Sequence, residues 1–417
     1  MTRLNQLALL CVAGLLAGPA LAAPDAVTDW NDIAANAAAI GRPGAIGQVD
    51  LALVQAAVHD AIQSYEKRFE PYYAEVKPAG SKVAAAVAAA HGVLVGFYPA
   101  QAATLDATYG TYLANNGLTG NPGVAVGEAV AAMYLPLRRL DPNPLPAPFT
   151  GGTGIGQWRP TESFIDTAGP PDFAPMAFPW MGSFDPLTLT GPARFRAPPP
   201  PDVTSERYTK DYNEVKAKGA AVNSTRTPEQ TDIAYFWTDN FSVQLNRGIR
   251  ALVDARVPRI GDRARLLALA NIAGADSLIT TWDTKKYYFV WRPVTAIREG
   301  ENDGNPNTAG DGAWQSLVNN PNYPDYASGA NSITGAMTKS LELYFGKDNI
   351  PFVLTSNAPA AIKKTRNYGS FSAVATQCVN ARVYLGIHFR FADQAARTQG
   401  RKTAEFVHDH FLLPVVN

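Results

Sequence analysis

Apolar side chains recur every three to four residues along much of the chain, which is the spacing of helices that bury one face. The clearest stripe runs from Ile46 to Tyr65, and an Ala-rich stripe runs from Val83 to Phe97 and stops before Pro99. Runs of alternating apolar and polar residues, which are typical of strands, are scarce. The pattern therefore predicts a mainly α fold, a helical bundle. Further helical patterns cover residues 124–135, 262–288, 331–344 and 382–391.

The start of one more helix is marked by its residue types. Thr227 can cap the first turn, Pro228 suits the first helical position, and Gln230 can complete a reciprocal capping box. We therefore predict that a helix begins at Pro228.

Residues 141–203 interrupt this regularity. They hold fifteen of the chain's 32 prolines and show no helical period, so we predict a long irregular segment. Loops of this length are usually functional or act as linkers. Five aromatic residues indicate that the segment lies on the body of the protein, and the pattern leaves open whether it covers a pocket. These are Phe164, Phe173, Phe178, Trp180 and Phe184.

The first 22 residues have the pattern of a secretory signal peptide. Arg3 supplies a positive start, Leu7 to Leu16 form a short apolar run, and Ala20-Leu21-Ala22 offers small residues for cleavage. We therefore expect a secreted or periplasmic protein in which residues 23–417 form a single α-helical domain.

Composition and charge narrow the range of partners. The 417 residues include 36 Lys+Arg and 36 Asp+Glu, and this zero net charge without a basic run argues against nucleic acid or an anionic membrane as a partner. No later stretch is both long enough and free enough of charge to span a membrane. The cysteines are Cys11 and Cys378, and loss of Cys11 with the signal would leave no intrachain disulfide.

Residue types that bind oxyanions are spread over residues 227–417. Lys285 and Arg292 are seven residues apart, which on a helix is two turns and the same face, and Pro293 favours an extended Arg292. Two long cations could therefore converge on one anion. Ser328 and Gly329 stand at a predicted helix start, where backbone N–H groups and a hydroxyl would form an anion site.

Arg382 and His388 lie on one predicted helix. The guanidinium can contact an oxyanion through two N–H groups, and a neutral imidazole nitrogen can act as a nucleophile or a metal ligand. Taken one at a time, such residues are more commonly structural. Their order along the chain is the more specific signal.

That order resembles the signature K-x6-R-P, P-S-G-H and S-R-x5-H, which vanadium-dependent haloperoxidases share with the type 2 phosphatidic acid phosphatase superfamily. The first block is matched in full within WDTKKYYFVWRPVTAIR. The stretches LALVQAAVHDAIQSYEKRFEPYY and RTPEQTDIAYFW are also similar to bacterial haloperoxidase-related proteins. The other blocks appear as Ala327-Ser328-Gly329-Ala330 and as Ala381-Arg382, five residues and His388.

The resemblance implies a helical-bundle fold and a role for each matching residue. His388 would coordinate the vanadium of vanadate in a peroxidase, or attack phosphorus in a phosphatase. A buried oxyanion with several charges needs about this many positive donors to offset its desolvation. The groups implied to hold the oxygens of vanadate or phosphate are Lys285, Arg292, Ser328, the Gly329 amide and Arg382.

Ala330 is the departure with the largest consequence, because the family's histidine at this position is the acid–base group. Loss of such a group costs a factor of about 10² to 10⁴ in rate. Ala327 for proline and Ala381 for serine are smaller changes. The residues that could replace the histidine are Asp325, Tyr326, Asn331, His59, His91, His408 and His410.

Three functions are compatible with the sequence. The first is a haloperoxidase-like enzyme, impaired or altered by Ala330, which would use vanadate, hydrogen peroxide, a halide and a small organic acceptor. The second is an acid phosphatase that hydrolyses phosphomonoesters with His388 as the nucleophile. The third is a non-catalytic or non-redox protein that binds oxyanions. Vanadate binding without turnover would indicate the third.

Overall fold

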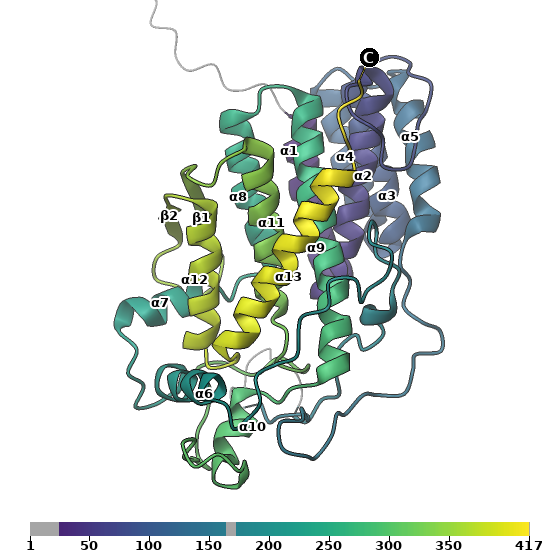
Figure 1. Cartoon of the computed structure of the whole chain (residues 1–417). Helices are drawn as coiled ribbons and strands as arrows, with labels where there is room; N and C mark the ends of the chain where they lie inside the picture. Colours follow the sequence, from purple (N-terminus) through teal and green to yellow (C-terminus); the bar gives the residue numbers. More distant parts are fainter. Residues whose placement is uncertain (1–24, 164–171, 417) are drawn as a thin grey trace, which may run out of the picture.

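The structure is a computed structural model that describes residues 25–163 and 172–416. The predicted signal peptide and Phe164 lie outside the described residues. Within them, thirteen α-helices and four short 3₁₀ helices accompany a single two-stranded antiparallel sheet (Figure 1). The predicted mainly α fold is confirmed.

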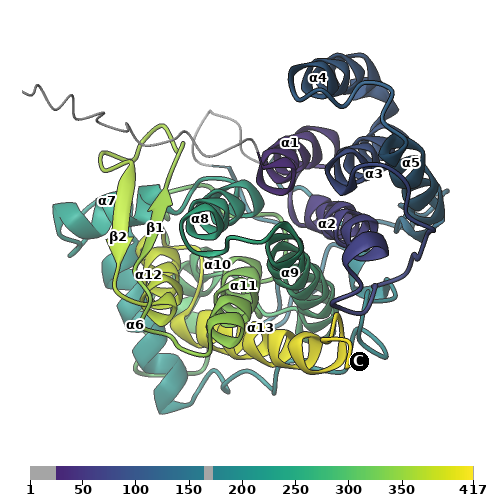
Figure 2. The same ribbon diagram turned by 90° about the horizontal axis from the view of Figure 1, so that it is seen from above.

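The helices form two groups on either side of α9 (Ile260–Tyr288), as the view in Figure 2 shows. The first group is α1 (Ala26–Gly41), α2 (Ala45–Glu66), α3 (Lys82–Phe97), α4 (Ala102–Asn115) and α5 (Gly123–Tyr134). The second group holds α8 (Phe241–Arg256), α11 (Gly329–Phe345), α12 (Phe371–Tyr384) and α13 (Arg390–His410). Smaller elements beside the second group are α6 (Glu206–Gly219), α7 (Pro228–Phe236), α10 (Pro293–Arg298), β1 (Phe352–Thr355) and β2 (Thr365–Tyr368).

Helix α9 is central because it packs against both groups, and it carries polar side chains that are satisfied internally. The Nδ2 of Asn271 donates to Asn246 Oδ1 at 2.9 Å, and Gln48 Nε2 donates to Asn271 Oδ1 at 3.0 Å. Buried amides paired in this way avoid the cost of unsatisfied polar groups. One cluster of buried apolar side chains extends from Ala26 to Leu412, so both groups share a core.

Helices α11 and α13 approach each other closely because glycine faces the neighbouring backbone on each helix. A Cβ at Gly400 would lie 2.1 Å from Ser332 O, and one at Gly335 would lie 2.7 Å from Arg397 O. Larger residues would force the helices apart. The contact brings the first turns of both helices together, and Asn331 Nδ2 donates to Asp393 Oδ1 at 2.7 Å.

Most of the predicted helices are confirmed, but two local predictions were wrong. Lys285 and Arg292 do not lie on the same face of one helix, because α9 ends at Tyr288 and Phe289 adopts a left-handed φ of 33°. The extended backbone predicted for Arg292 is confirmed, with φ −79° and ψ 156°. Arg382 and His388 do not share a helix either. Helix α12 ends at Tyr384, and Gly386 turns the chain with a φ of 77° before α13 begins.

The capping box at the start of α7 is confirmed, since the Thr227 hydroxyl accepts from Gln230 N and the Gln230 side chain accepts from Thr227 N. Within the described residues, the segment 141–203 is irregular except for a 3₁₀ turn at Met181–Ser183, as predicted. It is attached to α9 by Asp276, which accepts from Leu187 N at 2.6 Å and from Thr188 N at 2.8 Å. The segment therefore lies on the body of the protein.

In the described part of the chain, no single helix has both the length and the apolar character needed to cross a membrane. One pair of consecutive helical segments, Lys82–Phe97 and Pro99–Asn115, meets the length and composition criteria together but is bent by 114°.

Candidate active site

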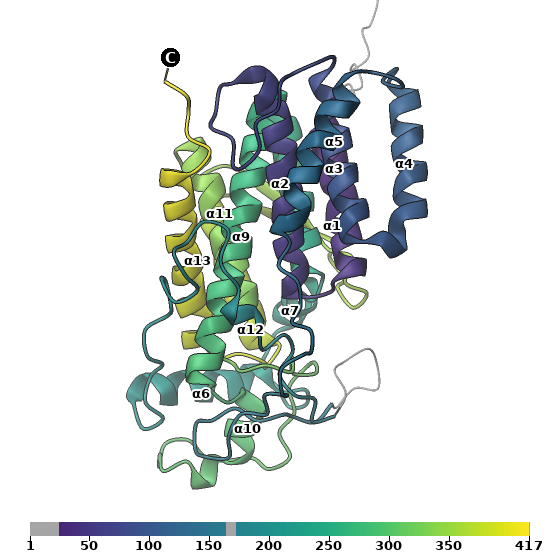
Figure 3. The ribbon, with the colours of Figure 1, turned by 90° about the vertical axis from the view of Figure 1, so that its right-hand side faces the viewer.

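The six residues proposed from the sequence meet at one end of the second helix group, the lower end in Figures 1 and 3. Five helix ends converge there: the last turns of α9 and α12 and the starts of α10, α11 and α13. They contribute Lys285 from α9, Arg292 as N-cap of α10, Ser328 and Gly329 at the start of α11, Arg382 from α12, and His388 just before α13.

Lys285 is completely buried and donates to two backbone oxygens, Pro324 O at 2.5 Å and Asp325 O at 3.2 Å. Its Nζ also lies 4.8 Å from the centre of the Tyr323 ring. Burial, followed by the neighbouring Arg292, holds the pKa of Lys285 well below its usual range. A bound anion would stabilise the ammonium form, so this environment favours anion binding.

Arg292 connects three parts of the site. Its Nε donates to Tyr323 O at 2.8 Å, and its Nη1 donates to Ile387 O at 2.7 Å. The same Nη1 lies 3.2 Å from His388 Nε2. Because arginine has no acceptor atom, His388 Nε2 must accept this bond, and the ring proton must lie on Nδ1.

Asp325 is the partner of that proton, since His388 Nδ1 and Asp325 Oδ1 are 2.6 Å apart. Both side chains are buried. Burial raises the pKa of Asp325 to about 7, although Arg292 and Lys285 oppose the shift. Burial and the nearby cations, Arg292 first, hold the pKa of His388 well below its usual range. His388 is therefore a neutral imidazole whose orientation is set by Asp325.

Ser328 and Gly329 form the opening of α11. Ser328 is the N-cap residue, yet its hydroxyl makes no capping hydrogen bond to the helix. It lies instead beside Asn331, whose Nδ2 is 3.4 Å from Ser328 Oγ. Burial raises the pKa of Asp393 well above its usual range, although contacts with Ser328 and Asn331 stabilise the carboxylate. Burial therefore favours the protonated form of this carboxyl group.

Arg382 completes the set of cations. Its Nη1 donates to Trp237 O at 3.2 Å, and its guanidinium lies 5.4 Å from the centre of the Phe241 ring. Arg382 lines a cavity together with Gly329 and Ile387, the residue before His388. Of the six predicted site residues, Gly329 and Arg382 line this cavity.

The described residues fit an oxyanion of the vanadate or phosphate type. Two buried guanidinium nitrogens, Arg292 Nη2 and Arg382 Nε, have no hydrogen-bond partner in the protein. Buried donors without partners are costly unless a ligand accepts from them. Two guanidinium groups lie beside a neutral histidine, and a nearby anion would favour the protonated form of Lys285. A multiply charged anion would therefore satisfy both the unpaired donors and the positive charge.

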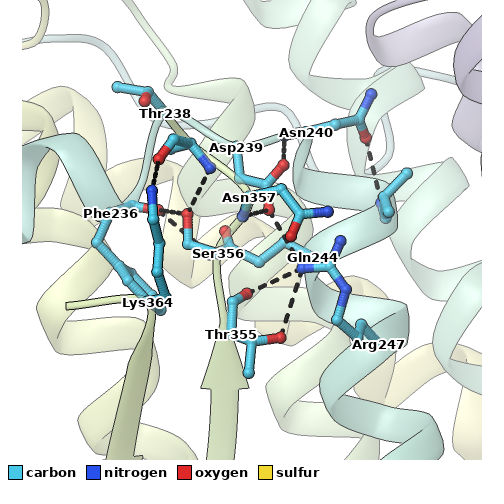
Figure 4. A network of polar contacts seen from close by, with 12 residues as sticks. Phe236, Thr238, Asp239, Asn240, Gln244, Arg247, Thr355, Ser356, Asn357 and Lys364 are labelled. Carbon is cyan, nitrogen blue, oxygen red and sulfur yellow. Dashed lines mark hydrogen bonds and ion pairs between the residues drawn. The ribbon is translucent and has the colours of Figure 1, made fainter. Parts of the chain in front are cut away.

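The cavity has a volume of about 830 Å³ and is walled by several segments. Part of its wall comes from the turn between α7 and α8 and from the loop after β1. Asp239 Oδ2, in the turn between α7 and α8, accepts from Asn357 N, in the loop after β1, at 2.8 Å (Figure 4). Ser356 Oγ, in the same loop, donates to Phe236 O at 2.8 Å. Arg247 Nη1 pairs with Asp239 at 3.3 Å, so this part of the wall is held in place by a network of polar contacts.

Ala330 lines this cavity, and the described residues around it include no histidine. Among the proposed replacements, Asp325 contacts His388, but the carboxylate oxygen that does so is engaged with His388 Nδ1. The amide of Asn331 is engaged with Asp393, and the hydroxyl of Tyr326 donates away from the site to Pro198 O.

The histidines proposed as replacements lie elsewhere. His59 is buried in α2, with Nε2 3.1 Å from Glu70 O, and His91 pairs with Asp106 at 2.7 Å. His408 and His410 are in the last turn of α13, at the opposite end of the helix from His388. The structure therefore brings none of the four histidines to the cavity that Ala330 lines.

Sequence reasoning missed two contributors to the site. Tyr323 lies against both Lys285 and Arg292, with cation-to-ring distances of 4.8 and 5.0 Å. Asp393, in the first turn of α13, sits beside Ser328 and Asn331. An acidic residue in the first helical turn is a common pattern on exposed helices, so its burial gave no signal in the sequence.

Comparison with known proteins supports the same fold. Residues 265–415 match the family "VCPO second helical-bundle domain". The vanadium chloroperoxidase of Curvularia inaequalis is 25% identical over 287 residues, a match that covers 52% of this chain and 46% of that protein. The chain thus matches less than half of that relative's length.

Solved structures extend the likeness over nearly the whole chain. A bacterial vanadium-dependent iodoperoxidase superposes with a TM-score of 0.78 and 21% identity over 94% of this chain and 98% of its own. A bacterial vanadium-dependent chloroperoxidase in its holo form gives a TM-score of 0.71 and 18% identity over 89% and 93%. At these identities, the structural likeness establishes the fold.

Proposed function

We propose that this chain, which carries a vanadium chloroperoxidase-type domain in the fold of the bacterial vanadium haloperoxidases, is a haloperoxidase-like enzyme that binds vanadate. The observation that carries the proposal is the buried cation set around neutral His388, with unpaired donors on Arg292 and Arg382. The proposed enzyme departs from the family signature at Ala330, which offers no group for proton transfer.

In this proposal, Lys285, Arg292 and Arg382 neutralise the charge of the anion, and Ser328 and the Gly329 amide donate to it. His388 Nε2 presents a lone pair to the same site, and Asp325 holds the ring by accepting from Nδ1 at 2.6 Å. Vanadate bound in such a site supplies a Lewis-acidic centre that activates hydrogen peroxide towards halide.

The overall reaction consumes one proton: halide, hydrogen peroxide and a proton give hypohalous acid and water. A side chain that moves this proton normally contributes about 10² to 10⁴ to the rate. Ala330 lacks such a group, and the nearby Asp325 is held by His388. We therefore expect turnover to be slow and to depend on solvent for the proton.

The test is the bromination rate of the purified protein with bromide and hydrogen peroxide, after bound anions are removed and vanadate is added. Phosphate, which has the same shape and a similar charge but supplies no Lewis-acidic metal centre, is the control. Bromination that requires vanadate supports the proposal. Measurable vanadate binding without bromination overturns the peroxidase activity and leaves an oxyanion-binding protein.

A phosphomonoesterase is the second candidate, because the lone pair of His388 Nε2, which accepts from Arg292 in this structure, could attack phosphorus once a bound anion takes over that donor. Without an acid to protonate the leaving group, such an enzyme should hydrolyse p-nitrophenyl phosphate far faster than an alkyl phosphate. Hydrolysis of p-nitrophenyl phosphate that is lost in His388→Ala, in a protein that does not brominate, would favour this candidate.

We also propose that the protein is exported and cleaved after Ala22, because its first residues have the pattern of a signal peptide. N-terminal sequencing of protein from the culture medium or periplasm should begin at Ala23. A chain that keeps Met1 and stays in the cytoplasm would contradict this proposal.

A further inference from the structure

A second cavity lies between α13 and the Pro-rich stretch 195–201, four of whose seven residues are proline. Its volume of about 690 Å³ is within the range of about 300–1,000 Å³ typical of small-molecule sites. Within the described residues, it shares no lining residue with the cavity beside Ala330, and none of the six residues of the candidate active site lines it. The proposed reaction therefore gives this second cavity no role.

The walls of the second cavity are fixed by contacts with the rest of the protein. In the stretch 195–201, Arg196 pairs with Asp283 on α9 through Nε at 2.6 Å and through Nη2 at 2.8 Å. The hydroxyl of Tyr326 donates to Pro198 O at 2.6 Å. Helix α6, at the lower end of α13 in Figure 1, supplies a further part of the wall through its first turn. A ligand would therefore enter a preformed space, which lowers the cost of binding.

The charged residues on the walls are all cations. They are Arg196, Arg207 and Lys402, and Arg196 is neutralised by its pair with Asp283. Arg207 Nη2 donates to the uncharged Gln394 Oε1 at 3.2 Å. In the part of the chain that the structure describes, neither Arg207 nor Lys402 forms an ion pair, and the ammonium of Lys402 contacts no acceptor. Two unpaired cations without a carboxylate on the walls favour an anionic ligand.

These two cations lie at opposite ends of the second cavity. Gln394, Thr398 and Lys402 are spaced by four residues, so they lie on one face of α13, and each of them lines the cavity. Gln394 and Lys402 are eight residues apart, which is about 12 Å along the helix axis. Because Arg207 contacts Gln394, its guanidinium lies at one end of this face and Lys402 lies at the other.

The remaining lining offers apolar surface and few free polar groups. Three prolines, two phenylalanines and two alanines line the cavity. The hydroxyls of Ser205, Thr398 and Tyr326 already donate to backbone oxygens. A ligand rich in hydroxyl groups, such as a sugar, would lose its contacts with water here without gaining enough new ones. An aliphatic body loses little and covers the apolar surface.

We propose that the second cavity binds an elongated organic dianion, a linear dicarboxylate. One carboxylate contacts Arg207, the other contacts Lys402, and the aliphatic chain packs against the prolines and phenylalanines of the walls. Both cations bind carboxylates through charge-assisted hydrogen bonds. Because the second cavity is separate from the candidate active site, this binding does not require that the protein brominates.

Isothermal titration of the full chain with azelate, a saturated nine-carbon dicarboxylate, measures this binding at low ionic strength. We expect saturable binding that is weakened at least threefold in Arg207→Gln and in Lys402→Gln, and at least tenfold in Ala395→Leu, whose side chain extends into the cavity. Lys210→Gln, exposed on α6 outside the cavity, is the matched control and should bind within twofold of the wild type. No saturable binding, or equal binding by Arg207→Gln and Lys402→Gln, overturns the proposal.

Three analogues of the same chain length test the ligand chemistry without any variant. The neutral 1,9-nonanediol and the cationic 1,9-diaminononane should each bind at least tenfold more weakly than azelate. Nonanoate, which has one carboxylate, should bind at least threefold more weakly. Equal binding of the diol or the diamine would contradict an anion site, and equal binding of nonanoate would contradict a site with a cation at each end.

Arg382→Ala tests where the dicarboxylate binds, because it removes a cation of the candidate active site and leaves the second cavity intact. Azelate should bind this variant within twofold of the wild type, and a tenfold loss would place the dicarboxylate in the active site and overturn the proposal. Circular dichroism and thermal unfolding establish that each variant is folded. Azelate binding with the expected variant effects, in a protein that does not brominate, supports the dicarboxylate site and overturns the proposed function alone.

Discussion

The charge balance around His388 depends on a few buried neighbours that act together. Lys285, Arg292 and Arg382 each disfavour a protonated imidazole, while Asp325 accepts its Nδ1 proton. The result is a neutral ring whose Nε2 already accepts from Arg292 at 3.2 Å. An anion bound near this nitrogen would take over donors that the protein leaves unpaired.

Removal of any one cation should therefore weaken anion binding. We expect Lys285→Ala, Arg292→Ala or Arg382→Ala to lower vanadate affinity at least tenfold, because a hydrogen bond to a charged group contributes about 1.5–3 kcal/mol. Isothermal titration of vanadate checks this, with Arg401→Ala, which pairs with Glu342 elsewhere, as the control. Unchanged affinity in any of the three would show that they do not share one anion.

Because Ala330 offers no acid–base group, the proposed function predicts that Ala330→His raises the bromination rate. If the cation set supports bromination, a histidine at position 330 should raise the vanadate-dependent rate by about ten- to a hundredfold, part of the range of about 10² to 10⁴ for such groups. Ala330→Asn, of similar size but unable to carry the proton, is the matched variant and should not gain activity.

His59 should make stability depend on pH. Burial lowers the pKa of His59 to about 4, against an ordinary value of 6.5, so its contribution to stability is complete above pH 6.5 and is lost as the pH falls towards 4. At pH 5, about 1.5 units below 6.5, the loss is ~2 kcal/mol at about 1.4 kcal/mol per unit.

Urea unfolding at pH 7 and pH 5 measures this effect. From pH 7 to pH 5, the free energy of unfolding of the wild type should fall by ~2 kcal/mol more than that of His59→Gln. The partly exposed His408→Gln should follow the wild type. The same pH dependence in all three proteins would refute the assignment to His59.

At the scale of elements, the irregular segment 141–203 is positioned by α9 rather than by its own structure. Asp276 is fully buried and accepts from Leu187 N, Thr188 N and the Thr188 hydroxyl. Further along α9, Trp282 Nε1 donates to Ala177 O at 3.0 Å, and Ala177 lines the cavity. One helix thus places both Lys285 and part of the cavity wall.

Asp276→Ala should loosen this segment. Two backbone N–H groups would lose their partner, at a cost of about 1–3 kcal/mol each if they stay buried. We expect limited proteolysis within residues 141–203 to become several-fold faster, with cleavage sites read by mass spectrometry. Asp185→Ala, an exposed acidic residue in the same segment, is the control and should be cleaved at the wild-type rate.

At the scale of the whole molecule, the site joins the ends of five helices, so a bound anion should stabilise all the helices that meet there. A ligand at a hundred times its dissociation constant adds ~2.7 kcal/mol to the free energy of unfolding. Vanadate should therefore raise the melting temperature of the wild type, and this rise should disappear in Arg292→Ala. An equal rise in both proteins would indicate binding elsewhere.

The sequence by itself determined the features that depend on neighbouring residues. The helical stripes at 46–65, 83–97 and 262–288 coincide with α2, α3 and α9, because a buried face imposes its period locally. The capping box of Thr227 and Gln230 is likewise a contact within one turn. The order of the anion-binding residue types could be read before any contact between them was known.

Tertiary structure alone decided how these residues meet. Asp325 and His388 are 63 positions apart, and their 2.6 Å contact depends on the packing of α11 against α13 and on the turn at Gly386. That turn also separates Arg382 from His388, where periodicity predicted one helix. Local patterns cannot specify such contacts, because the free energy that fixes them comes from burial between distant segments.

The cavity beside Ala330 also could not be predicted from local sequence patterns. Its walls come from α7, α8, α9, α11 and the long loops between them, and each lining residue taken alone is an ordinary apolar or polar residue. By resemblance, position 330 is an alanine where the family signature has a histidine. Only the packed structure showed that this alanine lines a cavity, because the volume beside it is bounded by residues far away in the chain.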